Sequence, residues 1–110
     1  MFQLKNIVMY YILAFVTNLD VNFIAVDWEP FTYKFFLYSG QYSRYISLRV
    51  AKLIDWFNEL GVPFTNFHLI GFSVGAHMVG YAARNSNGLI EYITGKLKLD
   101  LFVMYLIVYL

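Results

Sequence analysis

The sequence of 110 residues contains no cysteine, little charge and only two prolines. Without cysteine the chain can form neither disulfides nor thiolate zinc sites, and it cannot use a thiol as a nucleophile. The absence of cysteine does not indicate whether the protein is intracellular or secreted, because a secreted protein need not contain disulfides. Charged residues make up 14% of the chain and sum to a net charge of +1. There is no cationic excess for neutralising phosphates, so we expect no nucleic-acid partner.

Apolar residues are abundant. They make up 60% of the chain, above the roughly 45–50% typical of soluble domains, which excludes a disordered protein. The length corresponds to about one small domain. His68 and His77 lack a paired carboxylate at ligand spacing, and there is no phosphate-binding loop, so we expect neither a metal site nor a cofactor. The sequence does not indicate an oligomeric state.

Two apolar stretches, at residues 7–16 and 101–110, are about half the length of a transmembrane helix, which needs about 20 residues. We therefore expect no integral membrane span. Residues 1–17 are interpreted either as an N-terminal apolar helix or as a signal-like segment. The helix interpretation predicts packing against the sheet, and the absence of a small-x-small cleavage site after the apolar stretch disfavours a signal peptide.

The order of elements predicts an α/β fold. Apolar residues recur every three to four positions from Tyr42, and Gly61 with Pro63 predicts that this helix ends at Leu60. The expected elements are a strand at 21–26, a helix at 42–60, a strand at 67–70, a helix from 74 and a strand at 89–94. Alternating strands and helices of this kind predict a mostly parallel sheet with right-handed crossovers.

The second strand-to-helix junction carries a G-x-S-x-G motif, formed by residues 71–75. A serine at the tip of such a turn points out of the sheet, and only very small residues fit two positions before and after it, where strand and helix nearly collide. We therefore expect Ser73 to be a nucleophile flanked by the elbow glycines Gly71 and Gly75. The backbone N–H of Val74, at the helix N-terminus, is the candidate oxyanion donor.

Three segments carry a family resemblance. They are HLIGFSVGAH at 68–77, followed by GYA at 80–82, then NFIAVDW at 22–28 and ITG at 93–95. These segments resemble the pancreatic lipase family, including its secreted phospholipase A1 branch, over about residues 18–95. The resemblance implies that 18–95 is a partial α/β-hydrolase domain. It also implies an extracellular lipase or phospholipase A1 that hydrolyses carboxylic esters of lipids with Ser73 as the nucleophile.

The sequence departs from the family after this match. In the family, Ile-Thr-Gly is followed by Leu-Asp-Pro-Ala, whose aspartate completes the catalytic triad, whereas Lys96 and Leu97 occupy the first two places here. Asp100 follows, but no histidine comes after it, and the family's upstream His-Gly oxyanion loop is absent from the sequence. We expect the chain to be inactive alone. The alternative is a non-enzymatic lipid-binding protein or an inert lipase-like relic.

Three other polar residues are interpreted as structural. His77 lies one helical turn after Ser73, so its ring is expected to point along the helix flank. His68 is expected to form a hydrogen bond to a neighbouring element. Asp27 precedes the serine, which is the wrong chain order for the triad acid, and is expected to bond a neighbouring loop.

Residues 96–110 form an apolar tail that we expect to lie outside the family pattern. Gly95-Lys96-Leu97 can be encoded as GGT AAG TTA, which contains a splice-donor sequence, so the tail is interpreted as a translated intron or a similar gene-model error. This interpretation predicts a β-prone segment without a partner. The alternative is a genuine apolar strand or helix that replaces the family's catalytic loop.

Overall fold

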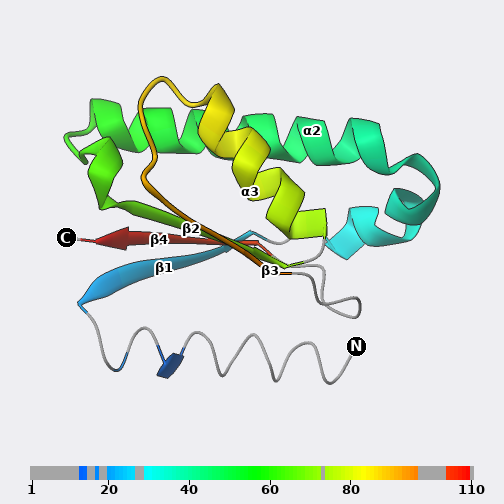
Figure 1. Cartoon of the computed structure of the whole chain (residues 1–110), viewed down its shortest axis with the longest axis horizontal. Coiled ribbons are helices and arrows are strands. Elements are labelled where there is room, and N and C mark those ends of the chain that lie inside the picture. The colour runs from blue at the N-terminus through cyan, green and yellow to red at the C-terminus, as the bar shows by residue number, and fades with distance from the viewer. Residues whose placement is uncertain are drawn as a thin grey trace.

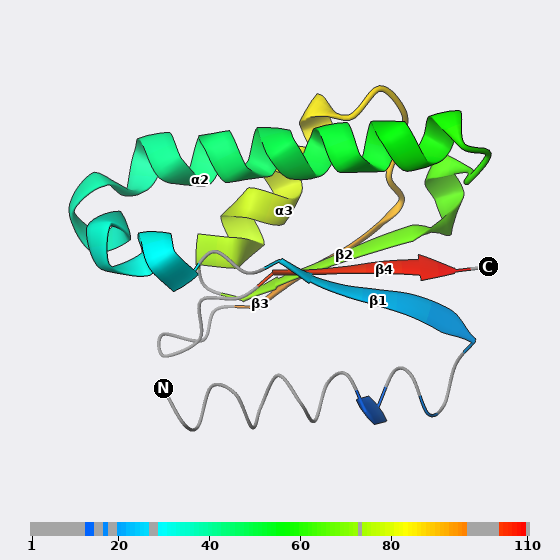
Figure 2. The ribbon, with the colours of Figure 1, turned by 180° about the vertical axis from the view of Figure 1, so that it is seen from behind.

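The computed structural model describes residues 13–14, 17, 20–26, 29–72, 74–96 and 104–109. Two helices cover one face of a four-stranded sheet (Figure 1). The elements, in order, are β1 (Val21–Val26), α2 (Glu29–Glu59), the 3-10 turn η1 (Phe64–Asn66), β2 (Phe67–Phe72), α3 (Val74–Asn85), β3 (Tyr92–Lys96) and β4 (Met104–Tyr109). The view from behind shows α2 and α3 again on the same side of the strands (Figure 2).

The sheet is mixed, with the strand order β1-β4-β2-β3. Among the described strands, only β2 and β3 form a parallel pair, and β4 runs antiparallel to both β1 and β2. The expectation of a mostly parallel sheet is therefore wrong. The three strands predicted from the sequence do run in one direction, as helical crossovers require. However, β4 lies between β1 and β2, and strand-helix alternation does not reveal whether strands that follow one another in the chain are also neighbours in the sheet.

Several element boundaries differ from those expected. β1 spans the predicted residues, β2 extends two residues further, and β3 begins at Tyr92 instead of residue 89. α2 begins at Glu29, thirteen residues before the predicted start at Tyr42. Pro30 does not prevent this earlier start, because proline in the first helical turn removes an N–H that has no intrahelical acceptor.

The end of α2 agrees with the sequence prediction to within one residue. Gly61 has a positive φ of 106°. The N–H of Val62 donates to the carbonyl of Phe57 at 3.1 Å, and the N–H of Gly61 donates to that of Asn58 at 3.0 Å. These two bonds form a Schellman motif, in which glycine adopts the left-handed conformation without a Cβ clash.

The core lies between the sheet and the two helices. α2 contributes a stripe spaced by four residues, as its sequence pattern predicts, and α3 contributes its small and apolar residues. The buried cluster comprises Ile46, Val50, Ile54, Phe67, Leu69, Met78, Val79, Ala82, Ile90, Leu106 and Val108. Ser47 is a polar residue with no exposed surface, and its hydroxyl donates to the carbonyl of Ser43 at 2.6 Å.

Strand β4 overturns the expectation that the tail has no partner. Leu106 and Ile107 are 0% exposed, and the strand pairs with β1 on one side and with β2 on the other. Residues 104–109 therefore form an apolar strand, while the origin of the tail as a translated intron stays a prediction. Residues 97–103 and 110 lie outside the described part of the chain.

The N-terminal segment is described at only three positions. Leu13, Ala14 and Thr17 are helical, while the rest of residues 1–17 lie outside the described part. The expected packing of this segment as a helix thus stays a prediction. Within the described residues, no helix combines the length and the hydropathy needed to cross a bilayer.

The position of Leu106 predicts a large stability effect. We expect Leu106→Ala to lower the free energy of unfolding by about 2–5 kcal/mol, because it leaves a cavity in the core cluster. Leu60→Ala is the matched control: Leu60 is 63% exposed, and its truncation should change stability by about 0.5 kcal/mol or less. Urea denaturation measures both. Equal effects of the two substitutions would contradict the placement of β4 in the core.

Candidate active site

A single residue separates the strand and the helix of the G-x-S-x-G motif. β2 ends at Phe72 and α3 begins at Val74. Ser73, the predicted nucleophile, is that single residue and lies outside the described part of the chain. Val74 occupies the first helical position, where backbone N–H groups have no intrahelical acceptor and carry the positive end of the helix dipole. An anion that develops beside this terminus would be stabilised by these groups.

The backbones of strand and helix are in close contact at the two motif glycines, and both residues are buried. A Cβ at Gly71 would clash with the carbonyl carbon and oxygen of Gly75 and would lie 2.7 Å from the backbone nitrogen of Ala76. No rotamer relieves such a clash, because the obstructing atoms belong to the main chain. Position 71 therefore requires glycine, which is the steric condition that the motif spacing predicts.

Gly95 supplies a second close approach that the sequence analysis did not assign. In the parallel pairing of β2 and β3, Gly71 is the partner of Gly95. A Cβ at Gly95 would lie 3.1 Å from the Cβ of Ala76, closer than most Cβ contacts, so that Ala76 would have to shift slightly. The first turn of α3 thus packs against a glycine on each of two adjacent strands, β2 and β3. An isolated glycine inside a strand pattern indicates such a close approach, and that signal was present at this position.

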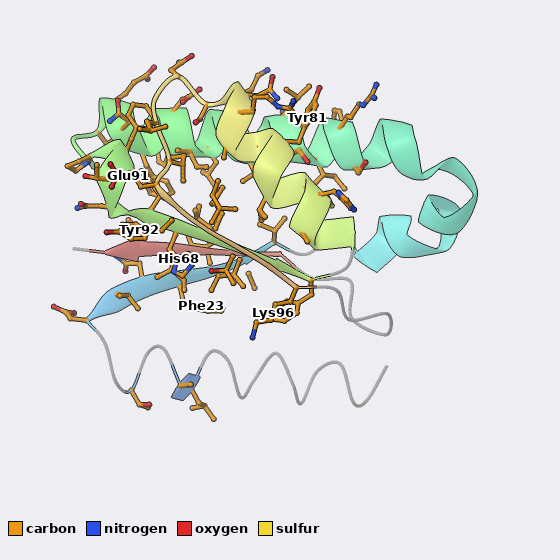
Figure 3. All side chains as sticks on the ribbon, viewed as in Figure 1. Phe23, His68, Tyr81, Glu91, Tyr92 and Lys96 are labelled. Carbon is orange, nitrogen blue, oxygen red and sulfur yellow. The ribbon has the colours of Figure 1, made fainter. Side chains whose placement is uncertain are left out.

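His68 is held by the neighbouring strand. Its Nε2 forms a 2.8 Å hydrogen bond with Oγ1 of Thr94 on β3, which confirms the expected structural contact. The rings of His68 and Tyr92 lie 6.2 Å apart, and both residues lie on the side of the sheet away from the helices (Figure 3). Burial lowers the pKa of His68 below its ordinary 6.5, because the charged imidazolium is desolvated.

The structure does not place His68 at the junction. Four residue steps along β2 separate it from Phe72, which corresponds to about 13 Å of strand. His77 is exposed on α3. Asp27 and Asp100 lie outside the described part of the chain. No hydrogen bond involving the His77 side chain occurs among the described contacts, whereas His68 is bonded to Thr94 on β3.

The strand register also locates the position at which the family's aspartate is replaced. Phe72 is the partner of Lys96 in the parallel β2–β3 pair. Positions 73 and 97 each follow by one residue, beyond the described ends of these two strands. The parallel strands β2 and β3 thus end at the same edge of the sheet. Across the described ranges, no group of three or more metal-ligating side chains occurs.

The glycine contact predicts opposite effects of two alanine substitutions. Gly71→Ala should lower the free energy of unfolding by about 3 kcal/mol or more, because the new Cβ meets backbone. Gly80→Ala, in the same motif-bearing helix, should raise it by up to about 1 kcal/mol, because no atom lies within 4 Å of the new Cβ and alanine favours the helix. Chemical denaturation of both variants provides the measurement. A tolerated alanine at 71 would contradict the described junction.

The environment of His68 predicts a loss of stability in acid. Because burial lowers its pKa, the unfolded chain binds a proton at this residue at a higher pH than the folded chain does. The contribution to stability is full above the ordinary value of 6.5 and falls as the pH drops below it. Urea midpoints between pH 8 and pH 5 should depend less on pH in His68→Gln than in the parent. His77→Gln, at an exposed position, is the control, and a pH dependence that survives in His68→Gln would refute the assignment.

The comparisons with known proteins identify the family of the chain. The sequence profile of the family described as Lipase matches residues 3–100. The chain is 38% identical over 77 residues to lipoprotein lipase from Neovison vison and 36% identical over 77 residues to lipoprotein lipase from Homo sapiens. Each alignment covers 69% of this chain and 16% of the relative, and no solved structure matches. The profile match includes β2, the G-x-S-x-G motif and α3. The chain therefore belongs to the lipase family, in the pancreatic lipase group that its motifs resemble.

Proposed function

We propose that this chain carries the nucleophile segment of a carboxylic ester hydrolase that acts on lipids. The observation that carries the proposal is the backbone contact between Gly71 and Gly75, which brackets Ser73 between the end of β2 and the start of α3. A contact this close leaves room only for a sharp turn, and such a turn presents the serine hydroxyl at the sheet edge. Similarity to lipoprotein lipases supports lipid esters as the substrate class.

In the proposed reaction, Oγ of Ser73 attacks the ester carbonyl carbon. The carbonyl oxygen gains negative charge as the tetrahedral intermediate forms, and the N–H of Val74 donates a hydrogen bond to it. A base must accept the hydroxyl proton during the attack and then return it to the departing alkoxide. The chain's own contribution is therefore the nucleophile and one oxyanion donor.

We further propose that the 110-residue chain does not turn over esters by itself. After Ser73 the sequence contains one histidine, His77, on the exposed flank of α3. Leu97 stands where the family pattern has its aspartate, and an aliphatic side chain cannot orient an imidazole. Without an oriented base, the serine stays a weak nucleophile at neutral pH.

The specific lipase activity and the cellular location of the protein are also part of this proposal. Triacylglycerol lipase or phospholipase A1 activity, and an extracellular location, follow from the sequence resemblance. The chain spans 16% of the length of the curated relatives that it matches, so their complete activity extends to this chain only as part of the proposal. Leu97 favours a second candidate, a lipid-binding or inert protein that keeps the core of the fold without the reaction.

The isolated chain provides the first test. We expect its hydrolysis of a short-chain aryl ester to equal that of Ser73→Ala, because no base is placed to take the serine proton. Initial rates of chromophore release measure this. Hydrolysis that is lost in both Ser73→Ala and His77→Ala would refute the expected inactivity and would identify His77 as the base.

A chimeric protein can distinguish the proposed hydrolase from the alternative of an inert or lipid-binding protein. Residues 18–95 would replace the matching segment of human lipoprotein lipase, so that the rest of that protein is retained. We expect the secreted, folded chimera to hydrolyse a lipid ester and to lose this activity on Ser73→Ala. Human lipoprotein lipase with its own elbow serine changed to alanine is the matched control. A folded chimera without activity would favour the inert alternative.

A further inference from the structure

The loop between α3 and β3 contains a chemically reactive pair. α3 ends at Asn85 and β3 begins at Tyr92, and between them lies Asn87-Gly88. Of the seven asparagines in the sequence, Asn87 alone is followed by glycine. Its side chain is exposed, and residues 86–88 form bends outside any helix or strand. The loop runs past the C-terminal half of α2 (Figure 1).

We propose that Asn87 is a site of spontaneous deamidation, and that the product weakens the attachment of this loop to α2. The backbone nitrogen of Gly88 attacks Cγ of Asn87, a new C–N bond forms, and the side-chain amide leaves as ammonia. Water then opens the five-membered succinimide at either carbonyl, giving aspartate or isoaspartate. The net change consumes one water, releases one ammonia and adds one carboxylate.

Glycine at position 88 favours the attack and is also required by packing. Without a Cβ, residue 88 does not obstruct the approach of its nitrogen to Cγ of Asn87. A Cβ at this position would clash with the ring of Phe64, which is part of the turn before β2. The reactive pair therefore cannot be removed at position 88 without disturbing the packing of Phe64.

The structure also indicates what the modification would do. The backbone N–H of Asn87 donates to Oδ1 of Asp55 on α2 at 2.7 Å, which joins the loop to the helix. A carboxylate on residue 87 would lie close to the Asp55 carboxylate, and like charges at such separation repel. Isoaspartate would also lengthen the main chain beside Gly88, which is packed tightly against Phe64.

The first experiment measures where amides are lost. The full chain would be incubated at neutral and mildly alkaline pH, and peptide mapping by mass spectrometry would follow every asparagine. We expect Asn87 to lose its amide before any other, with isoaspartate among the products. Asn85 is the internal control, because it is exposed in the same region but precedes serine. Loss at Asn85 as fast as at Asn87, or no loss at Asn87, would overturn the proposal.

A double-mutant cycle tests the consequence. Asn87→Asp reproduces one product, and Asp55→Asn removes the opposing charge but keeps an oxygen that can accept the hydrogen bond. We expect Asn87→Asp to lower the urea midpoint in the parent and to lower it less in the Asp55→Asn background. An equal decrease in both backgrounds, or no decrease in either, would overturn the proposed weakening. Ester hydrolysis is not measured in either experiment, so the result is independent of the proposed function.

Discussion

The first turn of α3 packs directly on the backbone of the sheet, and the rest of the described fold is arranged around this contact. Gly71 and Gly95 lie side by side on β2 and β3, and Gly75 and Ala76 cover them from the helix. Because none of these positions carries a side chain larger than methyl, helix and sheet approach closely enough for one residue to link them. A larger group at Gly71 would lift the helix and move the serine with it.

The β2–β3 pair is also fixed further along the strands by a polar contact. His68 and Thr94 bond across the pair on the face away from the helices, while the glycines meet α3 on the helix side. The parallel pair that supports the junction is therefore held from both faces of the sheet. The histidine thus stabilises the pairing of β2 and β3.

The sequence predicted the elements that depend on local patterns. β1, the end of α2 and the start of α3 lie within one residue of their expected positions, because β-branched runs, Gly61 and the motif spacing each carry a local signal. Sheet order depends on long-range pairing, which no local pattern encodes. The partner of β4 was therefore missed, as was the early start of α2 across Pro30. At the site, the small residue required at Gly71 was foreseen, while the role of Gly95 depends on a strand register that only the structure supplies.

The location of β4 affects how the chain can fold during synthesis. β1 pairs with no described strand other than β4, and the register joins Val21 to Tyr109 across nearly the whole chain. A nascent chain that has emerged as far as Lys96 can already join β2 to β3, but β1 must wait for residues 104–109. Closing such a long loop raises the contact order and slows folding. Until residues 104–109 have emerged, the edges of β1 and β2 that face β4 have no partner, and open strand edges of this kind can pair with other chains.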